Sequence, residues 1–111
     1  AFANSIEAII AGINCIDATL YGMGRGAGNC PLELLLNFLK NPKFDIRPIL
    51  EIIQESLIPM KEEVEWGYHI PYMITGILNE HPRSGMKMMA SKKLPNLKQF
   101  YEDLRDGTPL D

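Results

Sequence analysis

The sequence is poor in cysteine. It has two cysteines, Cys15 and Cys30, which form no Cys-x-x-Cys motif and are too few for a disulfide framework. We therefore expect two reduced, partly buried thiols. The alternative is a reactive thiol at Cys30, which stands beside an expected helix N-terminus whose partial positive charge favours a thiolate.

Long hydrophobic runs and an excess of basic residues are also missing. The longest apolar stretches, such as residues 34–36, are far shorter than the ~20 residues that cross a bilayer, so we expect no membrane association. No basic-then-apolar leader is present, which predicts a cytoplasmic protein. The formal net charge of −3 and the pI near 5.3 argue against a general nucleic-acid binder. The chain begins at Ala1 without an initiator Met.

The 111 residues, of which 46% are hydrophobic, are enough for one compact core. The first forty alternate between helical and extended patterns, as in an α/β protein. They predict a helix over 5–11, a strand over 13–20, a glycine-rich loop over 22–29 and a helix over 32–40. Asn4 or Ser5 is expected to cap the first helix, Gly12 to end it, and Pro31 to begin the second.

Beyond residue 41 the pattern is helical throughout, with proline at most of the expected helix starts. Helices are predicted over 48–57, 60–66 and 71–78, from Pro82, and from Pro95 and Asn96 to Gly107. Pro59 is expected to break or kink the first of these, because it lacks an N–H donor. The fold class is therefore mainly α, with about five to six helices and one short strand.

A single strand cannot satisfy its own backbone hydrogen bonds. Residues 13–20 would therefore pair with a second copy of the chain or with a sheet outside this sequence. Open strand edges favour association, so we expect a homo-oligomer.

The glycine-rich loop carries the strongest local signal. Gly22, Gly24, Gly26 and Gly28 allow positive φ and close approach of a ligand to the backbone, just before a helix N-terminus that favours anions. The pattern Gly22-x-Gly24-x-x-Ala27 formally matches a dinucleotide fingerprint, but the helix begins too late and the expected later acidic residue is absent. A purely structural turn is a further alternative.

The same region resembles a known enzyme family. The matching residues are Ala3-Asn4-Ser5-x-Glu7-Ala8-x-x-Ala11-Gly12 and Ile16-Asp17-Ala18-Thr19-x-x-Gly22-x-Gly24-x-Gly26-Ala27-Gly28-Asn29-x-Pro31-x-Glu33. They look like the end of a metal-dependent pyruvate-type aldolase barrel, the family of 4-hydroxy-2-oxovalerate aldolase, hydroxymethylglutaryl-CoA lyase and the isopropylmalate and homocitrate synthases. Trp66-Gly67-Tyr68-x-Ile70-Pro71-Tyr72 and Asn79-x-His81-Pro82 resemble the helical C-terminal region of aldolase-like members.

The resemblance implies that residues 1–40 are the last βα portion of a (β/α)8 barrel and that residues 41–111 are a helical extension. The loop residues Gly24, Arg25, Gly26 and Gly28 would then line the substrate site. Asn29 would be a ligand of a divalent cation, Mn²⁺ or Mg²⁺, which polarises the α-keto group of the substrate and stabilises the enolate formed on C–C cleavage.

The remaining metal ligands of the family, a His-x-His pair and an Asp, would lie before Ala1. The chain is therefore expected to be an inactive C-terminal fragment of an aldolase-type lyase that acts on a small α-keto acid. The family's reactive cysteine precedes the loop's Gly-Asn pair, whereas Cys30 follows it, so that role does not transfer. The alternative function is a self-standing helical interaction module with a structural loop.

Other side chains favour structural roles. His69 and His81 match no common metal spacing, and Asp17 could support the metal shell or cap a turn. Solvated or packing positions are expected for the acidic run Glu62, Glu63 and Glu65, the aromatic residues Trp66, Tyr68 and Tyr72, the methionines Met86, Met88 and Met89, and the basic set Arg83, Lys87, Lys92, Lys93 and Lys98.

Overall fold

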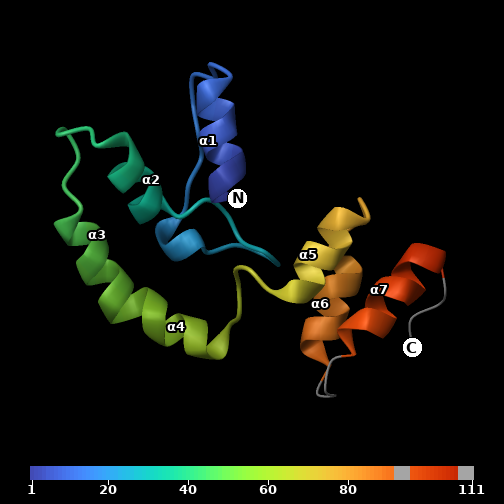
Figure 1. The fold of residues 1–111 in the computed structure, drawn as a ribbon. Helices are drawn as coiled ribbons and strands as arrows, with labels where there is room; N and C mark the ends of the chain where they lie inside the picture. The colour runs from blue at the N-terminus through green and yellow to red at the C-terminus, as the bar shows by residue number, and fades with distance from the viewer. Residues whose placement is uncertain (92–95, 108–111) are drawn as a thin grey trace. The chain divides into compact units, whose positions relative to one another are not determined.

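A computed structural model describes residues 1–91 and 96–107 of the chain. The chain forms two compact units, Ala1–Gly67 and a second unit that begins at Tyr68 (Figure 1). The described residues are mainly helical, as predicted. None of the helices within them has the length and apolar character that a membrane span requires.

The first unit begins with helix α1, Phe2–Ile10. This helix starts earlier than its sequence suggested, so the expectation that Asn4 or Ser5 caps it is wrong. Ser5 lies inside the first turn, where its Oγ donates to the carbonyl oxygen of Ala1 at 2.9 Å. Gly12 follows the end of the helix with a φ of +92°, a conformation in which a glycine costs least.

The predicted strand over 13–20 is not seen. Residues 13–18 are irregular, and the segment pairs only at its end, where Thr19 forms an isolated parallel bridge with Pro31. In this bridge Thr19 N donates to the Cys30 carbonyl at 2.9 Å, and Leu32 N donates to the Thr19 carbonyl at 2.8 Å. A strand needs partners along its whole length, and the described residues supply one.

A 3₁₀ turn, Leu20–Gly22, leads into the glycine-rich loop, and helix α2, Leu32–Leu39, follows it. Helix α2 ends at Lys40, which adopts a left-handed conformation with a φ of +53°. The loop is thus held between two short elements whose ends meet at the Thr19–Pro31 bridge.

Helix α3, Arg47–Ile52, and helix α4, Ile58–Glu63, run on through a π-helical turn, Ile53–Leu57. Pro59 therefore does not break the helix, contrary to one of the two outcomes expected from the sequence. Ile58 N donates to the carbonyl of Ile53, five residues back, so the hydrogen-bond register has already widened where Pro59 lacks its N–H. Helix α4 ends at Glu63, and Trp66 lies beyond it.

The core of the first unit lies under this helical run. Ile53, Leu57 and Trp66 are buried together, and Leu20 and Tyr21 pack against them. Trp66, with 3% of its surface exposed, joins the α3–α4 run to the turn that enters the loop. The prediction of a packing role for Trp66 is confirmed.

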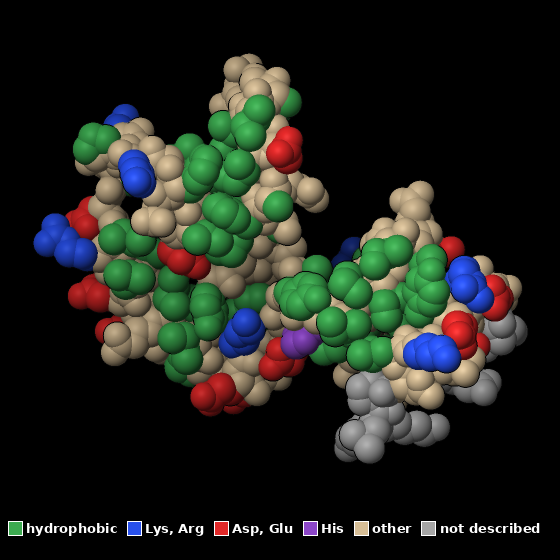
Figure 2. Space-filling model, in the orientation of Figure 1, with side chains coloured by type: hydrophobic (Ala, Val, Ile, Leu, Met, Phe, Trp, Pro, Cys, Tyr) green, Lys and Arg blue, Asp and Glu red, His purple; other side chains and the backbone are tan. Residues whose placement is uncertain are grey.

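Hydrophobic side chains also remain on the surface of this unit (Figure 2). Ile10 is 72% exposed and Phe38 is 48% exposed, although the Phe38 ring makes an edge contact with Phe2 at 6.2 Å between centroids. Five large hydrophobic residues of α1, α2 and the segment after α1 are exposed: Ile10, Ile13, Leu34, Phe38 and Leu39. Such a patch typically marks a surface that packs against another part of a protein.

The second unit contains helices α5, Ile70–Ile77, α6, Arg83–Ala90, and α7, Leu97–Asp106. Ile74 and Phe100 are buried, and Gly85 lets α6 approach α5 closely, because a Cβ there would lie 3.0 Å from a ring carbon of Tyr72. Asn96 caps α7 by accepting from Gln99 N at 3.1 Å, and Gly107 ends it, as predicted. Pro95 lies outside the described residues.

Candidate functional site

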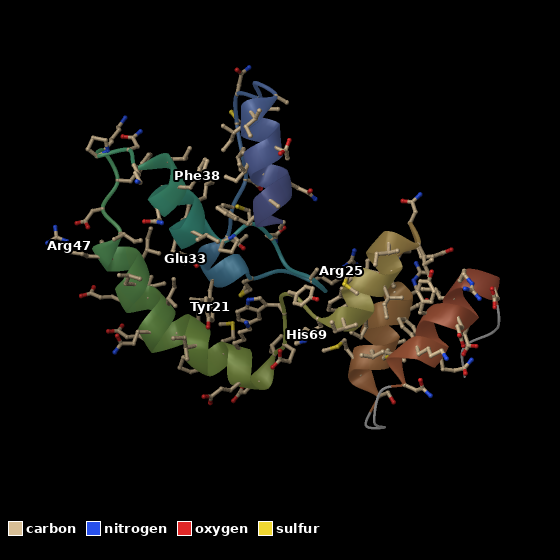
Figure 3. The ribbon with its side chains drawn as sticks, viewed as in Figure 1. Tyr21, Arg25, Glu33, Phe38, Arg47 and His69 are labelled. Carbon is tan, nitrogen blue, oxygen red and sulfur yellow. The ribbon has the colours of Figure 1, made fainter. Side chains whose placement is uncertain are left out.

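The glycine-rich loop, residues 22–29, is closed by its own backbone. Asn29 N donates to the Gly22 carbonyl at 2.9 Å, and Gly28 N donates to the Arg25 carbonyl at 3.2 Å. The first of these hydrogen bonds brings the two ends of the loop together beside the Thr19–Pro31 bridge. Arg25 lies exposed in the loop's outer part (Figure 3).

Two glycines are required by contacts within the loop. Gly28 has a φ of +78°, and a Cβ there would overlap the carbonyl oxygen of Gly22. A Cβ on Gly24 would overlap the side-chain nitrogen of Asn29 and lie 3.1 Å from its Cγ. The loop therefore admits the Asn29 side chain only because position 24 has none.

The Asn29 side chain has a defined orientation. Its Nδ2 donates to the Met23 carbonyl at 2.9 Å, and the same carbonyl accepts from Thr19 Oγ1 at 2.7 Å. The amide nitrogen is thus directed into the loop, and the amide oxygen, Oδ1, is the atom left to bind a ligand from the exposed side. Carbonyl oxygens of this kind suit hard divalent cations.

Tyr21 stands at the entrance to the loop in a strained conformation, with a φ of +58°. Side chains hold both of its backbone polar groups. Its N–H donates to Oε1 of Glu33 at 2.8 Å (both residues are labelled in Figure 3). Its carbonyl accepts from Nε1 of Trp66 at 3.0 Å. Its ring meets the Trp66 ring edge-on at 6.3 Å between centroids, and Lys61 Nζ lies 4.9 Å from the Tyr21 ring centroid.

A second contact joins the middle of the loop to the residues after α4. Gly67 N donates to the Gly26 carbonyl at 3.1 Å. Trp66 and Gly67, adjacent in sequence, therefore each donate one hydrogen bond to a backbone carbonyl in or beside the loop.

Cys30 directly follows the loop and is buried, with 3% of its surface exposed. This burial gives no support to a reactive thiol there. Cys15 is exposed, so the expectation of two partly buried thiols is wrong for that residue. Its segment is not part of a sheet and leaves the side chain uncovered.

The two histidines belong to the second unit. His69 makes an edge contact with Tyr72 at 6.2 Å between ring centroids, and His81 Nδ1 accepts from Arg83 N at 3.1 Å. Within residues 1–91 and 96–107, no group of three or more His, Cys, Asp or Glu side chains could hold a metal ion. Any cation bound at Asn29 would therefore need further ligands from outside the described residues.

The remaining candidates lie mostly where a structural role predicts. Glu62, Glu63 and Glu65 are exposed, while Met86, Met88 and Met89 are half-buried. Tyr68, at 70% exposed, departs from the expected packing role. A cavity of about 310 Å³ in the second unit is lined by His69, Ile70, Pro71, Met88, Met89, Ser91 and Leu97. Lys92 and Lys93 of the basic set lie outside the described residues.

Exposed ion pairs lie outside the loop, at the start of α3 and the end of α7. A side-chain hydrogen bond from Arg47 lowers the pKa of Asp45, and the same bond raises the pKa of Arg47. Arg105 likewise lowers the pKa of Asp106 by a side-chain hydrogen bond. Each pair joins residues at most two positions apart in sequence.

Sequence reasoning did not identify Tyr21, Lys61 and Gly67 as residues that shape the site. Glu33 is part of a motif and Trp66 is an expected packing residue, but the sequence does not predict that either holds the backbone of Tyr21. A left-handed tyrosine leaves no signature in composition or periodicity, and the partners Tyr21 and Trp66 are 45 positions apart. The one available signal is the Trp66-Gly67 pair, at the end of the helix predicted over 60–66.

Comparison with known proteins identifies relatives of this region. The HMGL-like family model matches residues 1–55. The chain is 41% identical over 64 residues to 4-hydroxy-2-oxovalerate aldolase of Acidovorax sp. (strain JS42), a match of 54% of this chain and 19% of the relative. It is 39% identical over 64 residues to that of Thermus thermophilus, a match of 54% of this chain and 18% of the relative.

A solved structure is also similar. The N-terminal domain of a proposed aldolase from Bacteroides vulgatus superimposes with a TM-score of 0.69 at 39% identity, over 82% of this chain and 31% of that one. The chain thus spans about a fifth of the curated relatives it matches. Residues 1–55, which contain the glycine-rich loop, match the HMGL-like family model, and the chain is similar in sequence to part of the 4-hydroxy-2-oxovalerate aldolases.

Proposed function

We propose that these residues belong to an aldolase-type carbon–carbon lyase that acts next to an α-keto group with the help of a divalent cation. In this proposal residues 1–40 form the last βα portion of a (β/α)8 barrel, and residues 41–111 form a helical extension. The observation that carries the proposal is the coincidence of the HMGL-like match with the loop that orients Asn29.

The exposed hydrophobic residues of α1 and α2 support the same proposal. Outer helices of a barrel pack their apolar sides against strands and neighbouring helices. Ile10 and Phe38 leave such sides uncovered in this chain, as expected if the rest of a barrel covers them. The chain alone is then inactive, because it would supply one metal ligand of several.

Asn29 fits the role of that ligand. Its amide nitrogen is bound to the Met23 carbonyl, so the amide oxygen Oδ1 of this exposed side chain is the atom that would bind the cation. A cation bound there, Mn²⁺ or Mg²⁺, would supply Lewis-acid polarisation of the substrate's α-keto oxygen. Asn29 itself would hold and orient the cation, and it would donate no proton.

The other loop residues would bind the substrate. Arg25 presents an exposed guanidinium, which recognises the carboxylate of a small α-keto acid by paired hydrogen bonds. Gly24, Gly26 and Gly28 keep the backbone free of side chains, so that substrate and Asn29 can approach each other. Homo-oligomer formation stays a prediction.

The test is aldol cleavage of a 4-hydroxy-2-oxo acid by the full-length protein with Mn²⁺ or Mg²⁺. Asn29→Ala is expected to lower kcat/KM by at least about tenfold and to weaken Mn²⁺ binding, measured by isothermal titration. Asn37→Ala, an exposed asparagine on α2, is the matched control and should leave both unchanged. Unaltered turnover and Mn²⁺ affinity in Asn29→Ala would remove this residue from the site.

A further inference from the structure

The helical run α3–α4 reaches the glycine-rich loop through the two residues that follow it, Trp66 and Gly67. Trp66 donates to the Tyr21 carbonyl, one residue before the loop, and Gly67 donates to the Gly26 carbonyl in its middle. These contacts lie between residues 40 or more positions apart in sequence. They connect the proposed barrel portion with the proposed extension.

We propose that Trp66 and Gly67 are positioning residues, which hold the loop in the conformation that presents Asn29. The inference rests on the proposed function for its catalytic meaning, but the positioning itself is a property of this chain. Neither residue touches the proposed substrate or cation. Each would act through the backbone of the loop.

The fixed side of this connection is the core. Trp66 is packed with Ile53 and Leu57 and is only 3% exposed, so the surrounding core restricts its indole. Buried indole N–H groups need an acceptor, and here the acceptor is the Tyr21 carbonyl at 3.0 Å. The α3–α4 run therefore sets where Tyr21 lies.

At the other end of this connection, the backbone of Tyr21 is strained and depends on the side chains that bind it. A non-glycine residue at a φ of +58° persists only where the surroundings over-determine it. Glu33 accepts a hydrogen bond from the N–H of Tyr21, and Trp66 donates one to the Tyr21 carbonyl. Lys61 adds a cation 4.9 Å from the Tyr21 ring centroid and 5.9 Å from that of Trp66.

A short path connects Tyr21 with Asn29. Gly22, the next residue, offers its carbonyl to Asn29 N at 2.9 Å, and Met23 offers its carbonyl to Asn29 Nδ2 at 2.9 Å. A change in the backbone at Tyr21 therefore reaches both hydrogen bonds of Asn29 within two residues. Loss of the Trp66 hydrogen bond should loosen the loop while α2 stays intact.

The competing explanation is that Trp66 only fills the core. Leu57→Ala separates the two, because Leu57 is buried in the same cluster, 7% exposed, and its side chain has no hydrogen-bonding group. Trp66→Phe keeps an aromatic ring in that cluster but removes the N–H donor.

The experiment is amide hydrogen exchange by NMR on the 111-residue chain. In Trp66→Phe, the Gly28 and Asn29 amides should exchange roughly two- to tenfold faster relative to the Leu35 amide of α2, the range expected for one lost hydrogen bond. In Leu57→Ala, these amides should keep their rates relative to Leu35. Equal patterns in the two variants would overturn the proposal.

Lys61→Met provides a second variant if Trp66→Phe does not fold. It preserves the stem of the side chain and removes the charge over both rings. The Gly28 and Asn29 amides should then exchange about two- to fivefold faster relative to Leu35. Unchanged relative rates would again overturn the positioning role. Because exchange needs no turnover, a failed aldolase assay with loop-selective exchange would refute the proposed function alone.

Discussion

Gly28→Ala tests the geometry of the loop most directly. At this position an alanine meets two penalties. The left-handed conformation, with a φ of +78°, costs a non-glycine residue about 1–2 kcal/mol. Its Cβ would also overlap the Gly22 carbonyl oxygen, a backbone atom that accepts the Asn29 N–H. Displacing that oxygen would break a hydrogen bond that contributes a net stabilisation of about 0.5–1.5 kcal/mol.

The sum is a destabilisation of about 1.5–3.5 kcal/mol. It can be measured by urea unfolding followed by the fluorescence of Trp66, the single tryptophan of the chain, which is buried in the same unit. With an unfolding slope of about 1–2 kcal/mol per molar urea, the midpoint should fall by roughly 0.8–3.5 M.

Gly12→Ala is the matched control. Gly12 has a φ of +92°, but a Cβ there would have no neighbouring atom within 4 Å. This variant should lose only the conformational part, about 1–2 kcal/mol. If Gly28→Ala destabilises the chain no more than Gly12→Ala does, the close approach of Gly28 to Gly22 does not hold the loop, and the reasoning fails.

Two further predictions concern charged side chains. Glu33→Ala leaves the N–H of Tyr21 without its carboxylate acceptor, so it should destabilise the first unit by about 1–3 kcal/mol. Glu33→Gln keeps an acceptor and should destabilise it less. Equal losses of stability in urea unfolding would contradict the Tyr21 hydrogen bond. Because Arg47 lowers the pKa of Asp45, NMR titration should show this carboxyl titrating below its ordinary range, and Arg47→Gln should raise its midpoint. The small stabilisation from this pair is present above the ordinary carboxyl pKa and is lost as the pH falls through the lowered pKa of Asp45. An identical Asp45 titration midpoint in the unsubstituted protein and in Arg47→Gln would show that the pair does not form in solution.

Local sequence signals predicted the helices well. Pro48, Pro71 and Asn96 lie at or near helix starts, and Gly107 lies at a helix end, because the features that start and end helices act over a few residues. The helix is not broken at Pro59, because a π-helical turn that begins six residues earlier has already changed the hydrogen-bond register.

The strand over 13–20 shows where local reasoning stops. Its β-branched residues indicate an extended chain, but a strand exists only if distant backbone supplies hydrogen bonds, and here Thr19 alone is paired. The site shows the same division. The glycines marked the loop, and a family resemblance marked Asn29, whereas the Tyr21–Trp66 contact spans 45 positions and depends on packing.

The Met23 carbonyl accepts two hydrogen bonds, and this restricts which amino acid can occupy position 29. Aspartate and asparagine are both hard oxygen ligands of similar shape. A carboxylate at this position would place a negatively charged oxygen against a carbonyl oxygen that already accepts from Thr19 Oγ1, and nothing would bridge the two. The turn therefore favours a neutral side chain at position 29, and in the proposed site this would leave a bound cation with more of its charge to act on the substrate.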